Sequence, residues 1–344
     1  MIMDENLFMA MLTRCTTGTF TIKDLRKTIS VAHGEKGETI RPLLITDEGK
    51  FLLMINPHQG DTIVGKGNIK TAMFALNLDT ADLNVVTVTK KELCNPIDWK
   101  TLSNEIDLLK QFKGTPEFLQ LITFRMLEDE CTIITQYCNG GSLIQAILSK
   151  ALSFPETVQI ALDLSHGLVK IHSLNLIHRD LTPNNVLLVK KPNELTRGVI
   201  ADFGQICEQT DLAQKKKLVL FPLWIAPEKA KLIFTHEEGS PAWQAMTTQK
   251  EDIWSLGLIF FLLFRGGVPH FQQKTSPNED LFALMERLSS LTQEAFSKEI
   301  RASPLPPFCI PLIECMLQID PQKRLDAQTI HAELCMIKKL MQSA

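Results

Sequence analysis

The spacing of hydrophobic residues changes near residue 140 of this 344-residue chain. Before that point, short runs rich in apolar and β-branched residues are separated by glycine-containing turns, which predicts strands. The strands are expected at 43–46, 51–55, from Gly60 onward, at 84–89 and up to 137, with a helix around 104–112. After it, apolar residues recur at helical spacing and predict amphipathic helices. These helices are expected at 155–173, 248–264, 279–298 and 307–318. A β-rich part followed by a mainly helical part predicts an α+β fold.

The longest apolar run is IWSLGLIFFLLF, from Ile253 to Phe264. A helix needs roughly 20 apolar residues to span a bilayer, and this run is much shorter. The run therefore predicts a buried core helix and no membrane span.

Composition is that of an ordinary globular protein, with 44% hydrophobic residues, 22% charged residues and a net charge of -3. Such a balance does not favour a nucleic-acid binder or a membrane protein. The length is about twice the roughly 150 residues expected per domain. The eight cysteines are scattered, without a Cys-x-x-Cys pair, so we expect reduced thiols in the cytoplasm.

Two short motifs carry the chemistry. HRDLTPNNV occupies 178–186, and an Asp-Phe-Gly begins at Asp202, 22 residues after Asp180. Asp180 can accept the proton of an attacking hydroxyl, while Asn185 and Asp202 supply hard oxygen ligands for Mg²⁺. This pattern predicts transfer of a phosphoryl group from ATP.

These motifs resemble the catalytic core of the eukaryotic-type protein kinase superfamily. WIAPE at 224–228, DIWSLG at 252–257 and PQKRL at 321–325 follow them in the family's order. The resemblance implies a two-lobed kinase fold, in which Glu228 pairs with Arg324, Asp252 holds the backbone of the catalytic loop and His178 is a buried packing residue. It implies an N-lobe at 57–137 and a C-lobe at 138–344. Residues 1–56 match no kinase element, and the strands expected within them indicate an ordered N-terminal extension of unknown role.

The glycine loop departs from the usual kinase pattern. Kinases generally carry G-x-G-x-x-G followed by a strand whose Lys binds the α- and β-phosphates and pairs with a helix Glu. Here GKGNIKTA at 65–72 has Lys70 at the third glycine, and VVTVT puts Thr87 or Val88 where the strand Lys should stand. The helix Glu is present as Glu105.

GKGNIKT is similar to the loop of the with-no-lysine kinases, in which a Lys at this position reaches the phosphates from the neighbouring strand. The resemblance implies that Lys70 binds the phosphates and is held by Glu105, because a flexible ammonium can arrive from either strand. Gly65, Lys66 and Gly67 would complete the nucleotide loop, with the Lys66 side chain toward solvent. Two alternatives remain open: Lys70 is a solvated loop residue, or Lys90 binds the phosphates.

The segment TIITQYCNGGSL at 132–143 is similar to strand five and the hinge of a kinase. The resemblance places Thr135 at the gatekeeper position. Backbone groups of Gln136 to Cys138 would then contact the adenine edge.

Two further departures lie near the acceptor hydroxyl. Thr182 replaces the catalytic-loop Lys that neutralises the transferred group, and Phe221 replaces the Thr that usually precedes Pro222. Loss of such a preorganised group typically costs about 2.7 to 4 kcal/mol of transition-state stabilisation, which slows the reaction without abolishing it. Thr210, the one hydroxyl between Asp-Phe-Gly and Ala-Pro-Glu, lies too close to the former for the usual activating position.

The sequence therefore predicts an ATP- and Mg²⁺-dependent protein kinase that acts on protein hydroxyls, with Ser/Thr favoured over Tyr. A pseudokinase scaffold is the main alternative, because the strand Lys is missing. A small-molecule kinase would not explain Ala-Pro-Glu, Asp252 or Arg324. We expect a cytoplasmic location, or a host cytosol if the chain is a secreted bacterial effector, and a protein partner for residues 1–56.

Overall fold

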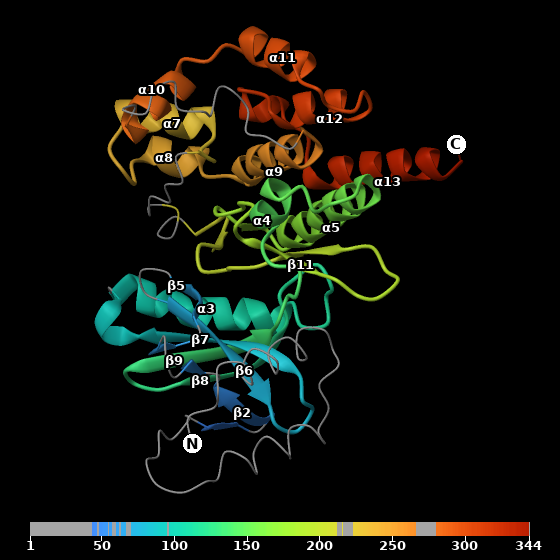
Figure 1. Ribbon diagram of the computed structural model, residues 1–344. Helices are drawn as coiled ribbons and strands as arrows, with labels where there is room; N and C mark the ends of the chain where they lie inside the picture. The colour runs from blue at the N-terminus through green and yellow to red at the C-terminus, as the bar shows by residue number, and fades with distance from the viewer. Residues whose placement is uncertain are drawn as a thin grey trace, which may run out of the picture. The chain divides into compact units, whose positions relative to one another are not determined.

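A computed structural model describes residues 43–46, 48–53, 55–56, 60–61, 63–66, 70–94, 96–211, 215, 223–265 and 280–343 (Figure 1). The chain divides into two compact units, with residues 116–118 and everything from Gly140 in the second. The first unit is built on an antiparallel sheet and the second is mainly helical. The predicted α+β fold is thereby confirmed.

The first unit contains a curled sheet in the strand order β1-β2-β6-β7-β9-β8, with β5 also paired to β6. Its strands are β1 (Leu43–Thr46), β2 (Gly49–Leu53), β5 (Ile63–Lys66), β6 (Lys70–Asn77), β7 (Leu83–Lys90), β8 (Leu121–Met126) and β9 (Glu130–Gln136). β3 (Ile55–Asn56) and β4 (Gly60–Asp61) pair separately. The two strands predicted at 43–46 and 51–55 are confirmed as β1 and β2, and β2 joins the sheet through β6.

A buried cluster stabilises this sheet. It is formed by Phe51, Met73, Ala75, Val86 and Ile134. Helix α3 (Pro96–Gln111) packs near β8, after a single 3-10 turn at Lys91–Leu93. It buries apolar residues at helical spacing, namely Leu102, Ile106 and Leu109. Packing along one face therefore fixes the rotation of α3, and with it the direction of Glu105.

The second unit is organised around α9 (Gln249–Arg265) and α5 (Phe154–Ser173), which contact each other. The apolar run from Ile253 to Leu263 is buried in α9, as predicted. The C-terminal helix α13 (Ala327–Ser343) lies along α5 (Figure 1). The remaining helices are α4 (Leu143–Leu148), α7 (Pro227–Thr235), α8 (Pro241–Met246), α10 (Leu281–Ser289), α11 (Gln293–Ala302) and α12 (Cys309–Met316), with a 3-10 turn at Pro321–Lys323.

The prediction of one helix over 279–298 is wrong, because α10 ends at Ser289 and α11 begins at Gln293. Thr292 adopts an extended backbone, and its hydroxyl accepts a hydrogen bond from the amide of Ala295. This cap satisfies an amide that would otherwise lack a partner at the start of α11. The apolar period continues through the break, and so the sequence pattern did not reveal it.

None of the helices in the described parts of the chain is long and apolar enough to cross a bilayer. The described cysteines are free thiols, as predicted.

The start of α5 allows a test of how capping contributes to stability. Glu156 accepts hydrogen bonds from the backbone amide and hydroxyl of Ser153, at 2.8 and 2.6 Å, and from the Thr196 hydroxyl. The Ser153 hydroxyl, followed by that of Thr196, lowers the pKa of Glu156 from 4.5 to about 2. The folded state therefore favours the ionised carboxylate.

We expect Glu156→Gln to lower the free energy of unfolding by about 1 kcal/mol at neutral pH, the usual size of a cap. Because the folded pKa is depressed, this contribution is present above pH 4.5 and disappears as the pH falls toward 2. Urea unfolding at several pH values measures the effect, and exposed Glu286→Gln is the matched control. The prediction is contradicted if the difference in unfolding free energy between wild type and Glu156→Gln stays the same as the pH is lowered.

Candidate active site

Lys70 and Glu105 form a close ion pair in the first unit. Lys70 opens β6, and its Nζ lies 2.8 and 2.7 Å from the two carboxylate oxygens of Glu105 on α3. Glu105 is buried, whereas a quarter of the Lys70 side chain (26%) is exposed. The ammonium is thus held by a buried carboxylate and still accessible to a ligand.

Strand register shows which residues share a face with Lys70. Lys70 pairs with Thr89 on β7, and Thr89 pairs with Cys131 on β9. Paired residues project to the same side of a sheet, and adjacent residues to opposite sides. Lys90 therefore projects to the other side, and it is exposed. Burial, together with the charge of Glu105, raises the pKa of Cys131 to about 11, so its thiol remains neutral beside the ion pair.

The predicted nucleotide loop is described only in part. Gly65 pairs with Ala72 and Lys66 with Thr71, which places both in the β5–β6 ladder. Gly67 lies outside the described residues.

The predicted hinge follows β9. Thr135 is buried and pairs with Val85 and Leu121. The Gln136 amide donates to the carbonyl of Gln120 at 3.0 Å, so that amide is already engaged in the fold. Burial raises the pKa of Cys138 to about 11.

In the second unit, a short hairpin brings the predicted magnesium ligands together. β11 (Val186–Val189) pairs with β12 (Arg197–Ile200), with Val186 opposite Ile200. Asn185 precedes the first strand and Asp202 follows the second, so both lie at the same end of the hairpin. The Asn185 carbonyl accepts a hydrogen bond from the amide of Ala201 at 2.8 Å.

The donor atoms at this end suit Mg²⁺. The Asn185 Nδ2 donates to the carbonyl of Asp180 at 2.9 Å, which orients the carboxamide. Asp202 is exposed, with φ of 59°, and its Oδ1 accepts a hydrogen bond from the amide of Gly204 at 3.2 Å. A carboxylate and a carboxamide oxygen are the hard ligands that Mg²⁺ prefers.

Asp252 of α9 holds the catalytic loop by its backbone. Its two carboxylate oxygens accept hydrogen bonds from the amides of His178 and Arg179, both at 2.8 Å. Arg179 adopts a positive φ of 68°, a conformation that these bonds help to maintain. The predicted role of Asp252 is thereby confirmed.

His178 is a packing residue, as predicted. It is fully buried, burial lowers its pKa, and its ring meets Phe203 edge-on at 6.2 Å between centroids. Its Nδ1 accepts a long hydrogen bond from the amide of Asp180, at 3.3 Å. The neutral imidazole thus supports the backbone that carries Asp180.

The predicted contact between Glu228 and Arg324 is also present. The two Nη atoms lie 2.7 and 2.6 Å from the carboxylate oxygens, and the Arg324 side chain is fully buried. Arg324 also donates to the carbonyls of Gln318 and Lys250. A bidentate ion pair with further hydrogen bonds satisfies both buried charges.

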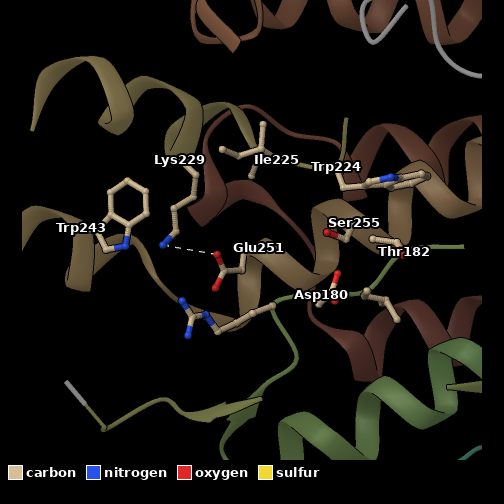
Figure 2. Close-up of a pocket in the computed structure, with 11 residues that line it drawn as sticks. Asp180, Thr182, Trp224, Ile225, Lys229, Trp243, Glu251 and Ser255 are labelled. Carbon is tan, nitrogen blue, oxygen red and sulfur yellow. Dashed lines mark ion pairs between the residues drawn. The ribbon is translucent and has the colours of Figure 1, made fainter. Parts of the chain in front are cut away.

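A cavity of about 40 Å³ is lined by the catalytic loop and by the helices after it. Figure 2 shows Lys229 and Glu251 pointing toward one another, with Asp180 and Thr182 across the cavity. The Lys229 Nζ lies 3.6 Å from Glu251, donates a hydrogen bond to the Thr247 hydroxyl and lies 4.7 Å from the centre of a Trp243 ring. Burial lowers the pKa of Lys229 and raises that of Glu251.

Sequence reasoning missed Lys229, Trp243 and Glu251. Two of them could have been found from their positions beside known motifs. Lys229 directly follows Ala-Pro-Glu, and Glu251 directly precedes Asp252. Of the other residues singled out in the sequence, Thr210 is exposed, and Phe221 lies outside the described residues.

The comparisons with known proteins are consistent with this geometry. A family model described as "Protein kinase domain" matches residues 59–335. The Serine/threonine-protein kinase ULK3 of Xenopus laevis is 26% identical over 82% of this chain and 55% of its own length. The Serine/threonine/tyrosine-protein kinase HT1 of Arabidopsis thaliana is 31% identical over 64% of this chain and 50% of its own. The Cytokinesis protein sepH of Aspergillus terreus is 30% identical over 68% of this chain and 16% of its own. The matches thus cover only part of each relative.

Proposed function

Because the chain belongs to the protein kinase domain family, we propose that it transfers the γ-phosphoryl group of ATP to a hydroxyl of a protein substrate. Serine or threonine is the favoured acceptor, because the similar ULK3 of Xenopus laevis is named a serine/threonine-protein kinase. The observation that carries the proposal is the contact between Lys70 and Glu105. The contact holds the Lys70 ammonium in place and leaves it accessible. No lysine of β7 projects to the same side of the sheet as Lys70.

Each residue has a defined role in the proposed reaction. Lys70 binds the ATP phosphates and Glu105 keeps its ammonium in place. Asp180 accepts the proton of the acceptor hydroxyl as that oxygen attacks. Asn185 and Asp202 would hold Mg²⁺, which neutralises phosphate charge when bound.

The adenine and phosphate contacts complete the nucleotide site. We propose that Gly65, Lys66 and Gly67 cover the phosphates, and that Thr135 and the backbone of Gln136 and Cys138 border the adenine. The buried, neutral Cys138 thiol is consistent with an apolar adenine environment.

Thr182 bears on the rate of the reaction. A hydroxyl stands where many kinases place the lysine that neutralises the transferred group, so less charge is compensated in the transition state. This feature favours a slow kinase, and it is also the observation that favours the alternative, a pseudokinase that binds protein partners. The intact set of Asp180, Asn185 and Asp202 favours the enzyme.

The setting of the enzyme is also a proposal. Scattered free thiols favour the cytoplasm, or a host cytosol for a secreted effector. We propose that residues 1–56, of which β1 and β2 belong to the sheet, carry a site for a protein partner.

Replacement of Lys70 tests the unusual phosphate ligand. We expect Lys70→Met to lower kcat/KM for ATP about 100- to 1,000-fold, because one preorganised charge is lost from the transition state. Lys90→Met is the matched control and is expected to retain wild-type activity, because Lys90 lies on the other face of β7. Phosphoryl transfer to a generic protein substrate measures both.

The outcome also separates the two candidate functions. A nucleotide-dependent rise of Tm in wild type, with turnover that depends on Lys70, supports the enzyme. If Lys90→Met abolishes turnover and Lys70→Met does not, the phosphate ligand is Lys90 on β7. Absence of both turnover and thermal shift in wild type favours the scaffold.

A further inference from the structure

A second cavity lies within the second unit, between α5, α13 and the start of β12. Its volume is about 360 Å³, within the range of cavities that hold small molecules. The lining carries three cations, Arg197, Lys338 and Lys339, and two histidines, His166 and His331. The proposed phosphoryl transfer uses none of these residues, so the cavity is a candidate for a separate binding site.

Both carboxylates of the lining already have cationic partners. Glu117 accepts hydrogen bonds from the Lys170 Nζ and the His166 Nδ1, both at 2.8 Å. Burial raises the pKa of Glu117, but these two hydrogen bonds outweigh burial and leave the pKa lowered, so the carboxylate is ionised. Asp163 accepts a bidentate pair of hydrogen bonds from Arg197, at 2.6 and 2.8 Å. Neither carboxylate therefore needs a further cation.

The ammonium of Lys338 contacts a neutral group. Its Nζ donates to the Oε1 of Gln159 at 2.8 Å, and the Nε2 of the same amide donates to Asp163 at 2.9 Å. The amide holds the ammonium at the cavity but does not neutralise its charge. Because both carboxylates are already compensated, Lys338 leaves the cavity with an excess of positive charge, which favours an anionic ligand.

The two histidines stack on one another, with ring centroids 4.9 Å apart and an angle of 19° between the planes. The Ser165 hydroxyl donates to the Leu162 carbonyl, so its oxygen accepts from the Nδ1 of His331, both at 2.9 Å. The Nδ1 of His166 donates to the ionised Glu117. A neutral imidazole carries one N–H, so both Nε2 atoms are acceptors, and protonation would make them donors.

The empty cavity disfavours protonation of this stack. Burial, followed by the charge of His166, lowers the pKa of His331, and the charges of Glu117 and Asp163 oppose that decrease. The other charged or titratable groups around the stack are Lys170 of α5, Arg197 of β12, and Cys335, Lys338 and Lys339 of α13. An anion placed among these cations would favour the protonated rings, so its binding is expected to be coupled to proton uptake.

We propose that this cavity binds a phosphate monoester of a small organic molecule. Its phosphate group lies among Lys338, Lys339 and the two histidines, and its organic part lies beside Leu162 and Cys335. A phosphate monoester carries close to two negative charges at neutral pH and three strong acceptor oxygens, which suits several donors better than one carboxylate does. The inference does not depend on the proposed kinase activity.

The first experiment follows the ring resonances of His166 and His331 by NMR in the full chain, each assigned by its loss in His166→Gln or His331→Gln. We expect both resonances to shift and saturate as glycerol phosphate is added. Lys338→Met is expected to weaken this binding about 10-fold, because a charge-assisted contact is lost. Lys338→Arg should retain most of the affinity, and Lys298→Met, at an exposed position of α11, should match wild type.

The readout is local, so phosphate bound at the nucleotide site does not affect it. Absence of a saturable shift, or equal affinity in Lys338→Met and Lys298→Met, overturns the proposal. Inorganic phosphate and succinate are expected to bind more weakly than glycerol phosphate. Equal binding of inorganic phosphate would limit the site to the ion, and equal binding of succinate would make it a carboxylate site; either result overturns the assigned ligand.

The second experiment tests the part given to the histidines. The pKa of the His331 ring is measured from the same resonance with and without saturating glycerol phosphate. We expect a higher pKa in the complex, because the bound anion stabilises the protonated ring. An equal pKa in the two states would remove the histidines from the site and overturn the placement of the phosphate group.

Discussion

Asp180→Asn is expected to lower the rate of phosphoryl transfer about 100- to 10,000-fold, the usual contribution of a general base. Asparagine has the same shape but cannot accept the proton of the acceptor hydroxyl. The loop itself should persist, because Asn185 binds the backbone carbonyl of residue 180 and Asp252 holds the two preceding amides. Single-turnover transfer from labelled ATP to a generic protein measures the effect.

Two further measurements make that result interpretable. The nucleotide-dependent shift of Tm should be retained in Asp180→Asn, and the exposed Asp107→Asn should have wild-type turnover. Retained turnover in Asp180→Asn would show that another group accepts the proton, and would contradict the role given to Asp180.

Arg324→Met is expected to have the largest effect on stability, lowering the free energy of unfolding by about 3 to 5 kcal/mol. Methionine fills much of the same volume but leaves the buried Glu228 carboxylate without its bidentate partner. It also removes the donors to the carbonyls of Gln318 and Lys250.

Arg301→Met is the matched control for Arg324→Met. Arg301 contacts Glu314 at 2.8 Å, but 69% of its side chain is exposed. An exposed ion pair contributes about 0 to 1 kcal/mol, because water screens it. Urea unfolding of both variants measures the difference. Equal losses of unfolding free energy in Arg324→Met and Arg301→Met would contradict the prediction that the buried ion pair contributes more than the exposed one.

The spacing of hydrophobic residues in the sequence identified the helices that are buried along one face or on all sides. The apolar run of α9 and the amphipathic α5 were predicted within about two residues of their observed ends. The break between α10 and α11 was not predicted. It depends on one hydroxyl, that of Thr292, in a stretch where the hydrophobic period is uninterrupted.

The candidate site was predictable where its chemistry is local in sequence. Asp180, Asn185 and Asp202 belong to two short motifs; a single hairpin brings Asn185 and Asp202 together, and Asn185 donates a hydrogen bond to the backbone of Asp180. Lys70 and Glu105 are 35 positions apart, and their contact could be expected only through a resemblance. Lys229, Trp243 and Glu251 were missed, because each belongs to a different helix and only the tertiary fold brings them together.

The pairing of β6 with β7 also bears on how the proposed phosphate site could change through substitution. Lys70 and Thr89 are direct cross-strand partners, and Thr87 projects to the same side. A lysine gained on one strand can therefore coexist with a lysine on the other before either is lost. Moving the positive charge from one strand to the other would then need only two single substitutions, and a cation would be present at each step.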